Sequence, residues 1–181
     1  MRSLPSFEPA DWTGPYDPTR HTTTAQFLWN LRKFKGDKWL DYVKGLAKQK
    51  PVLVESLAPV TTTIIKGEAL VGITYIKYIK QYKGPVDYIP MDQYLTDPNY
   101  LSLSAKASHP NAAKLYIDFA CSPEGQKEIA EDGEFVLAPG VYPPIKDADK
   151  VAPKMVFMDN PSEEEFKKLM SGTFREIFFA K

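Results

Sequence analysis

The chain has only one cysteine, Cys121, so it has no intrachain disulfide and lacks the cysteines of a zinc cluster. It also lacks an excess of either charge, because Lys plus Arg and Asp plus Glu both number 23. This balance disfavours a nucleic-acid binder, which needs basic residues to neutralise phosphates, and a polybasic membrane anchor. No apolar run approaches the roughly 18 residues of a membrane span, and the start of the sequence shows no signal peptide.

Catalytic and nucleotide-binding motifs are missing too: GxxxxGK[ST], GxGxxG, GxSxG and HExxH do not occur. The two histidines, His21 and His109, have no second ligand at the spacing of a metal site. Cys121 falls in an apolar helical pattern and is better explained as a small buried hydrophobic residue than as a nucleophile. The sequence therefore predicts a protein that is not an enzyme and has neither a metal site nor a cofactor.

Proline is abundant, with 16 residues, which disfavours a bundle of long helices. Helices are predicted from 22–24 to about 34, from Asp37 to about 47, and over 58–66, 75–82, 110–121, 123–132 and 162–170. Strands are predicted at 14–17, 52–55, 69–74 (as a central strand), 86–90 and 100–105, and a proline-rich loop at 136–161. This alternation predicts an α/β protein with a mixed or parallel sheet.

Two helix starts have clear capping signals. Ser122-Pro123-Glu124 combines an N-cap residue, a proline at the first helical position and a carboxylate in the first turn. Ser162 and Glu165 have the spacing of a capping box. Both positions are therefore predicted to begin helices.

The most suggestive local feature is the segment PTRHTTT at 18–24, immediately before a predicted helix. Free backbone N–H groups at a helix N-terminus attract anions, and threonine hydroxyls add donors. Arg20 can form a bidentate pair with a carboxylate or a phosphate. Simple capping of the helix by one threonine explains the segment better from local sequence alone.

Three tyrosines follow the predicted strand at 69–74, namely Tyr75, Tyr78 and Tyr82. Residues at the carboxyl ends of strands line the ligand crevices of open α/β sheets. Packing on an amphipathic helix explains Tyr78 and Tyr82 better. Tyr75, which is nearest the strand end, is open to a ligand role.

Four longer stretches carry a resemblance to a known family: DWTGPYDPTRHTTTAQFL, GDKWLDYVKGLAKQKPVLVES, IIKGEALVGITY and HPNAAKLYIDFACSPEGQKEIAEDG. In this order they resemble the C-terminal part of the extracellular (periplasmic) solute-binding proteins of bacterial ABC importers. The resemblance extends from about residue 7 to 178 and favours the branch that includes ferric-iron-binding proteins. It implies a periplasmic location.

The resemblance implies a two-lobed, type II periplasmic-binding-protein fold, with most of the first lobe and the signal peptide lacking a counterpart here. Residues 10–95 and 145–181 would form the second lobe, a mixed or parallel sheet flanked by helices. Residues 96–144 would be a returning first-lobe segment, a strand plus two helices, and residues 1–9 a loop.

The resemblance also implies ligand contacts. The anion-binding turn of the family matches Thr19, Arg20, His21, Thr22 and Thr23 by position. Ferric-binding relatives carry two adjacent iron-coordinating tyrosines where this sequence has Tyr75 and Tyr78. The pair is not adjacent here, which disfavours tyrosinate coordination of iron, although positions three apart share a helical face.

The leading functional expectation is a binding component that captures a small anionic solute or a metal chelate, such as ferric iron. Such a protein presents its solute to an ABC permease and closes two lobes around it. One lobe alone cannot clamp a solute, so we expect the isolated chain to bind weakly or not at all.

The alternative is a shortened lobe that acts as a self-associating module. Leu101, Leu103, Leu115, Tyr116 and Phe119 would face a missing lobe, and exposed apolar patches favour association. A homo-oligomer, formed by exchange of segment 96–144, would cover them. An enzyme on the same fold is the third hypothesis, because fold does not fix function.

Overall fold

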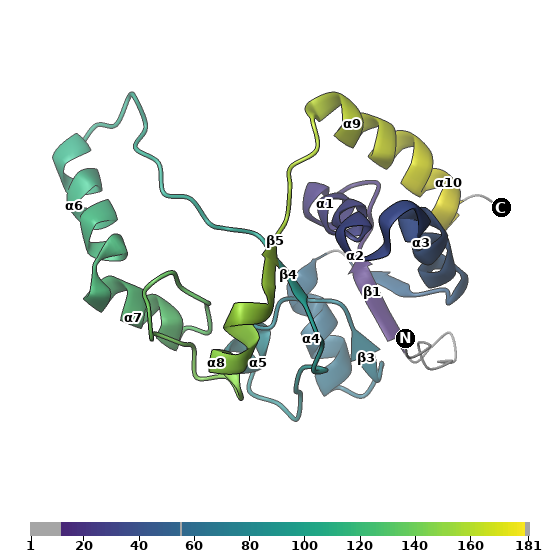
Figure 1. The fold of residues 1–181 in the computed structure, drawn as a ribbon, viewed down its shortest axis with the longest axis horizontal. Helices are drawn as coiled ribbons and strands as arrows, with labels where there is room; N and C mark the ends of the chain where they lie inside the picture. The colour runs from purple at the N-terminus through teal and green to yellow at the C-terminus, as the bar shows by residue number, and fades with distance from the viewer. Residues whose placement is uncertain (1–11, 55, 180–181) are drawn as a thin grey trace. The chain divides into compact units, whose positions relative to one another are not determined.

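The structure, a computed structural model, describes residues 12–54 and 56–179 (Figure 1), so the loop predicted at 1–9 lies outside the described residues. The chain forms two compact units. Unit 1 takes in the chain up to Tyr75, the stretch Gly84–Val86 and the chain from Met158 onward. Unit 2 takes in Ile76–Lys83 and Asp87–Phe157.

Unit 1 contains a parallel sheet of β1 (Trp12–Tyr16), β2 (Val52–Val54) and β3 (Val71–Gly72), in the order β2-β1-β3. The parallel sheet and the α/β class are thus confirmed. The expectation that 69–74 is the central strand was wrong, because β1 is central and β3 pairs only with β1 among the described strands. Only two residues of the β-rich stretch, Val71 and Gly72, form a ladder with β1.

The helices of unit 1 are α1 (Thr22–Asn30), α2 (Arg32–Lys35), the 3-10 turn η1 (Gly36–Lys38), α3 (Trp39–Lys48), α4 (Leu57–Ile65), α9 (Glu163–Lys168), the π-helical segment η3 (Leu169–Thr173) and α10 (Phe174–Phe179). The helix predicted from 22–24 to 34 is divided at Leu31 into α1 and α2. Gly36, with a φ of 51°, ends α2 in a conformation that favours glycine. Asp37 lies in the 3-10 turn that follows and is not the N-cap of α3.

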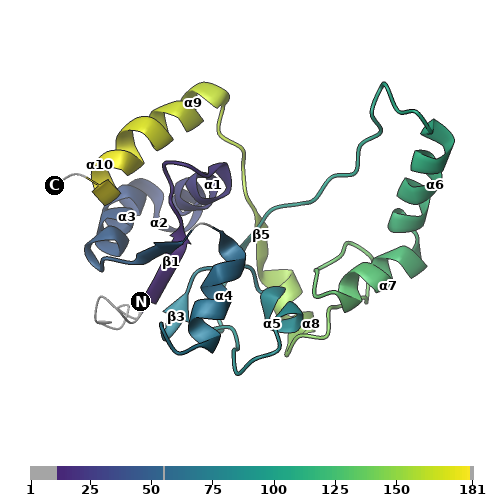
Figure 2. The ribbon, with the colours of Figure 1, turned by 180° about the vertical axis from the view of Figure 1, so that it is seen from behind.

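The core of unit 1 forms where α4 covers the sheet and the C-terminal helices pack on α1 and α3. Figure 2 shows α9 and α10 running beside α1 and α3. Leu28, Val43, Val60 and Phe174 are all fully buried. The ring of Phe174 meets Trp39 edge to face, with 6.5 Å between the ring centroids.

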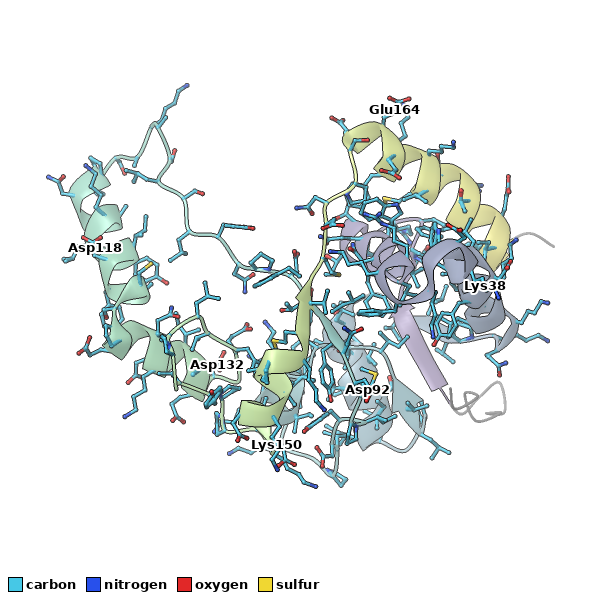
Figure 3. All side chains as sticks on the ribbon, in the orientation of Figure 1. Lys38, Asp92, Asp118, Asp132, Lys150 and Glu164 are labelled. Carbon is cyan, nitrogen blue, oxygen red and sulfur yellow. The ribbon has the colours of Figure 1, made fainter. Side chains whose placement is uncertain are left out.

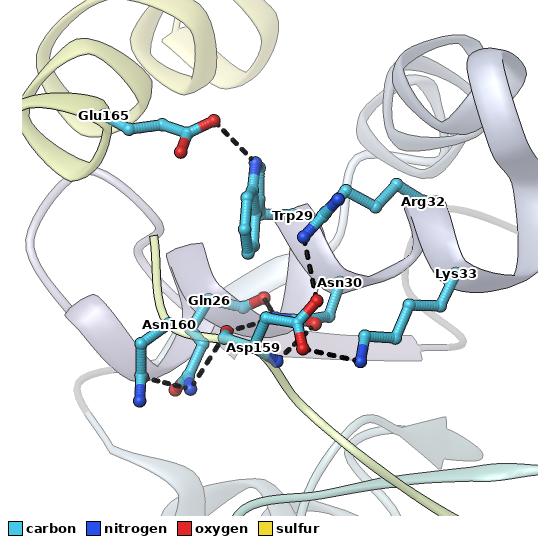
Figure 4. Close-up of polar contacts among 8 residues, drawn as sticks. All are labelled: Gln26, Trp29, Asn30, Arg32, Lys33, Asp159, Asn160 and Glu165. Carbon is cyan, nitrogen blue, oxygen red and sulfur yellow. Dashed lines mark hydrogen bonds and ion pairs between the residues drawn. The ribbon is translucent and has the colours of Figure 1, made fainter. Parts of the chain in front are cut away.

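A polar cluster, which we call the Asp159 clamp, fixes the start of the last unit 1 segment to α1 (Figure 4). The side chain of Asn30 is fully buried and binds the backbone of Asp159 twice: Oδ1 accepts from the N–H at 2.8 Å, and Nδ2 donates to the carbonyl at 2.9 Å. Gln26 Nε2 donates to Asn160 Oδ1 at 2.8 Å. The two bonds of Asn30 satisfy backbone groups that a sheet or helix would otherwise satisfy.

The carboxylate of Asp159 completes the clamp with two cations. Arg32 donates to it at 2.9 Å and Lys33 at 2.8 Å. The hydrogen bond from Lys33 is the main cause that holds the pKa of Asp159 below its ordinary value. Arg32 also lies over the ring of Trp29, 3.6 Å from its centroid, so one guanidinium joins α1 to the clamp.

The capping signal at Ser162 is confirmed in part. Ser162 Oγ accepts a hydrogen bond from the N–H of Glu165 at 3.2 Å, as an N-cap does. The side chain of Glu165 accepts a hydrogen bond from Trp29 Nε1 at 3.0 Å, which ties α9 to α1.

Unit 2 contains α5 (Tyr78–Gln81), β4 (Tyr94–Thr96), α6 (Pro110–Cys121), α7 (Pro123–Glu131), α8 (Ala148–Val151), the 3-10 turn η2 (Ala152–Lys154) and β5 (Met155–Phe157). β4 and β5 pair in parallel, with Tyr94 opposite Met155. The strands predicted at 86–90 and 100–105 were wrong, and β5 lies in the predicted loop 136–161. Alternating residues form a strand only where another strand supplies hydrogen bonds.

The corner between α6 and α7 follows the predicted capping signal, because Ser122 Oγ accepts from the N–H of Gly125 at 3.1 Å. The apolar stripe of α6 is open: Leu115 is 70%, Tyr116 63% and Phe119 51% exposed. Cys121 is exposed as well, so its predicted burial was wrong. Within α6 only Ala120 is buried.

Candidate functional site

The carboxyl ends of the three parallel strands of unit 1 bring several loops to one edge of the sheet. The loop after β1 leads into α1, and β2 is followed by the start of α4. The hydroxyl of Thr74, just after β3, donates to the carbonyl of Leu57 at 2.8 Å and so joins the end of β3 to the start of α4. Open parallel sheets bind ligands at this edge, which makes it the candidate site.

Asp17 organises the loop between β1 and α1. Its Oδ1 accepts hydrogen bonds from the N–H of Thr19 at 2.8 Å and from the hydroxyl of Thr19 at 2.6 Å. Its carbonyl oxygen accepts from the N–H groups of Arg20 at 3.1 Å and His21 at 3.2 Å. The backbone donors of residues 19–21 are therefore engaged by Asp17.

Among the described residues, the backbone N–H groups that no loop acceptor engages begin one residue later, at Thr22. The first helical hydrogen bond of α1 runs from Ala25 N–H to the carbonyl of His21, so the N–H groups of Thr22, Thr23 and Thr24 precede the helical ladder. His21, the N-cap, makes no side-chain cap hydrogen bond within the described residues, and the first turn holds no acidic residue. This helix end has the electrostatic character that anions favour.

The side chains of the predicted turn differ in accessibility. Arg20, His21 and Thr22 are exposed, and Thr19 and Thr23 are half-buried. Thr24, which was not predicted, is 2% exposed, and its hydroxyl has no hydrogen-bond partner in the part of the chain that the structure describes. The accessible groups at this end of α1 are thus the guanidinium of Arg20, the imidazole of His21 and the hydroxyls of Thr22 and Thr23, next to N–H groups that precede the helical ladder.

A hollow of about 350 Å³ lies beside this loop in unit 1. Asp17 and Thr19 line it from the end of β1, and Arg175 and Phe179 line it from α10. Sequence reasoning found Thr19 but missed the other three, because nothing local in the sequence connects the last helix with the first strand.

Over residues 6–157 the sequence matches a family described as bacterial extracellular solute-binding protein. The chain belongs to this family. Searches of curated proteins and of solved structures found no match. The match covers the predicted turn and both predicted tyrosines of this solute-binding protein, whereas Arg175 and Phe179 lie beyond it.

The two tyrosines of the solute-binding protein lie in different surroundings. Tyr75 is the last residue of the first stretch of unit 1, is 39% exposed and precedes α5. Tyr78 begins α5 in unit 2, where its ring meets Tyr82 edge to face with 5.4 Å between centroids. Because α5 begins at Tyr78, the shared helical face expected for these two residues does not form.

Within residues 12–54 and 56–179, no group of three or more His, Cys, Asp or Glu side chains is placed to hold a metal ion. No helix among the same residues is long and apolar enough to cross a bilayer. The side chains in unit 2 are shown in Figure 3, where Asp118 and Asp132 mark α6 and the end of α7.

Proposed function

We propose that this chain is the solute-binding component of an ABC importer and takes a small anionic solute or a chelated metal, such as ferric iron. Family membership supports solute binding outside the cytoplasm. The observation that carries the anionic preference is the N-terminus of α1, where three N–H groups precede the helical ladder beside exposed Arg20. The protein would work in the periplasm and deliver its solute to a permease.

In this proposal, Arg20 forms a bidentate pair with the anion, and the N–H groups and hydroxyls of Thr22 and Thr23 donate to it. Thr19 and His21 flank the bound anion on the same loop. Tyr75 and Tyr78 are the remaining proposed contacts, as hydrogen-bonding phenols. The proposal keeps residues 10–95 and 145–181 as a second lobe and 96–144 as a first-lobe segment.

The test is calorimetric titration of the purified chain with phosphate, citrate and ferric citrate. We expect weak binding, and Arg20→Gln should weaken it about tenfold or more, because a hydrogen bond to a charged group contributes about 1.5–3 kcal/mol. Lys114→Gln on exposed α6 removes the same charge far along the chain and should change nothing. Equal affinity of wild type and Arg20→Gln for all three probes would refute the anionic site.

A second function is favoured by the open face of segment 96–144, that of a self-associating module. Leu101, Leu115, Tyr116 and Phe119 are each at least half exposed, and Leu103 is 38% exposed. Exposed apolar side chains promote association where they gather into a patch. The proposed assembly is a homo-oligomer that covers this face, by exchange of the segment between copies.

Sedimentation velocity over a range of concentrations tests the assembly. Leu115→Glu should shift the protein toward the monomer, because a charge on the covered face is costly to bury. Ile89→Glu, at a 62% exposed position outside the segment, is the matched control. A monomeric wild-type protein at high concentration would rule out self-association.

A further inference from the structure

The hollow between the end of β1 and α10 shares Thr19 with the proposed anion-binding turn and adds side chains that the turn does not use. Among the described residues, it is lined by one carboxylate (Asp17), one hydroxyl (Thr19), one guanidinium (Arg175) and one aromatic ring (Phe179). Its volume, about 350 Å³, is at the lower end of the range of about 300–1,000 Å³ for small-molecule sites. All four residues belong to unit 1.

One side of the hollow accepts hydrogen bonds. The hydroxyl proton of Thr19 is directed to Asp17 Oδ1 at 2.6 Å, so this hydroxyl presents lone pairs and not a proton to the hollow. The carboxylate of Asp17 is itself an acceptor. An ammonium group satisfies both acceptors, whereas an anion would be repelled by Asp17.

The other side donates hydrogen bonds. Arg175 is exposed and forms no ion pair or hydrogen bond with any residue in the described ranges 12–54 and 56–179, so its guanidinium donors are available. Asp17 and Arg175 line the same hollow yet form no ion pair with each other. The two opposite charges therefore stand apart, with 48% exposed Phe179 supplying the apolar surface of the hollow.

We infer that this hollow is a subsite for a small zwitterion, an α-amino acid or a molecule with the same head group. The carboxylate of the ligand pairs with Arg175, its ammonium group binds Asp17 and Thr19, and its apolar side chain contacts Phe179. The inference rests on the proposed solute-binding function, but it gives Thr19 a different role, as an acceptor from a cation and not a donor to an anion.

The test uses L-leucine and two counterparts: 4-methylpentanoate, which lacks the ammonium group, and 3-methylbutylamine, which lacks the carboxylate. Amide chemical shifts of the 15N-labelled chain are followed during titration. Leucine should move the signals of residues 17–19 and 175–179, and each counterpart should bind at least about tenfold more weakly. Arg175→Gln should lose the preference for leucine over the amine, while Lys114→Gln should keep it.

The two sites fail independently in this design. If Arg20→Gln loses citrate binding but Arg175→Gln binds leucine as wild type does, the zwitterion subsite is refuted and the anionic turn stands. If Arg175→Gln loses leucine while Arg20→Gln keeps citrate, the turn is refuted and the subsite stands. Binding of 4-methylpentanoate as tight as that of leucine, or no shift with leucine, also refutes the subsite. Circular dichroism spectra of each variant must match the wild type.

Discussion

Unit 1 and unit 2 use amphipathic helices in different ways. In unit 1, α1, α3 and α10 each place an apolar residue in the core, where Leu28, Val43 and Phe174 have at most 1% exposure. In unit 2, the amphipathic α6 leaves the side chains of Leu115 and Tyr116 mostly exposed. An apolar stripe thus predicts that one face of a helix is suited to packing, but it does not predict which residues pack against that face.

The difference follows from which segments of the chain pack together in each unit. Unit 1 joins the beginning of the described chain to its end, so α9 and α10 return to cover α1 and α3. In unit 2, a segment without helix or strand, 97–109, leads from β4 to α6, as Figures 1 and 2 show. α6 then packs on α7, the helix that follows it directly.

The largest expected difference in stability is between alanine variants of two phenylalanines, one in each unit. Phe174→Ala removes a fully buried ring that meets Trp39, and should cost about 3–5 kcal/mol of unfolding free energy. Phe119→Ala, at a 51% exposed position of α6, should cost far less. Denaturant unfolding followed by circular dichroism measures both. Equal losses would show that the α6 face is already covered in solution.

The next effect concerns the Asp159 clamp. Asn30→Ala leaves the backbone N–H and carbonyl of Asp159 without their buried partner, which should destabilise unit 1 by about 2–3 kcal/mol. Asn111→Ala, on the exposed surface of α6, is the matched control and should be nearly neutral. Amide hydrogen exchange measures the stability of each unit separately. Faster exchange confined to unit 2 in Asn30→Ala would contradict the clamp.

Replacing a glycine by alanine should change stability in opposite directions in the two units, by an intermediate amount. A Cβ at Gly125 would lie 2.0 Å from the carbonyl oxygen of Phe119, so Gly125→Ala should force α7 away from α6 and cost about 1–3 kcal/mol. A Cβ at Gly45 in α3 meets nothing within 4 Å, and Gly45→Ala should stabilise unit 1 by about 0.5–1 kcal/mol. Thermal unfolding of both variants measures whether each is destabilised or stabilised. A stabilised Gly125→Ala variant would disprove the close packing of α7 against the end of α6.

The smallest effect is a pH dependence. The pKa of Asp159 is lower in the folded chain than in the unfolded chain, so its contribution to stability is present above the unfolded value, about pH 4. This contribution is lost as the pH falls through the lower folded pKa. The Tm of wild type should therefore exceed that of Asp159→Asn near neutral pH, and the difference should disappear in acid. A Tm difference between wild type and Asp159→Asn that grows in acid would contradict the prediction.

Local signals in the sequence predicted local structure well. Ser122 and Ser162 cap their helices as predicted, because a cap depends on residues only three positions apart. The strand predicted at 100–105 was wrong, because a strand needs a partner that its own sequence does not specify. β5 was missed in a proline-rich stretch for the same reason, since its pairing with β4 joins distant residues.

The candidate site also has a part that local sequence predicts and a part that only the fold reveals. The threonine-rich turn stands out in the sequence because its donors are consecutive residues at the start of one helix. Arg175 could not be predicted, because only the return of α10 to unit 1 brings it to the hollow beside Thr19. The role of Thr19 also depends on structure, since its bond to Asp17 decides which way its proton points.

The single cysteine has a practical consequence. Cys121 is exposed at the end of α6 in unit 2, whereas Trp29 and Trp39 belong to unit 1. A thiol-reactive dye would label unit 2 at one position and accept energy from these two indole donors of unit 1. Resonance energy transfer in the unaltered chain would thus report how the separation of the two units responds to each added solute.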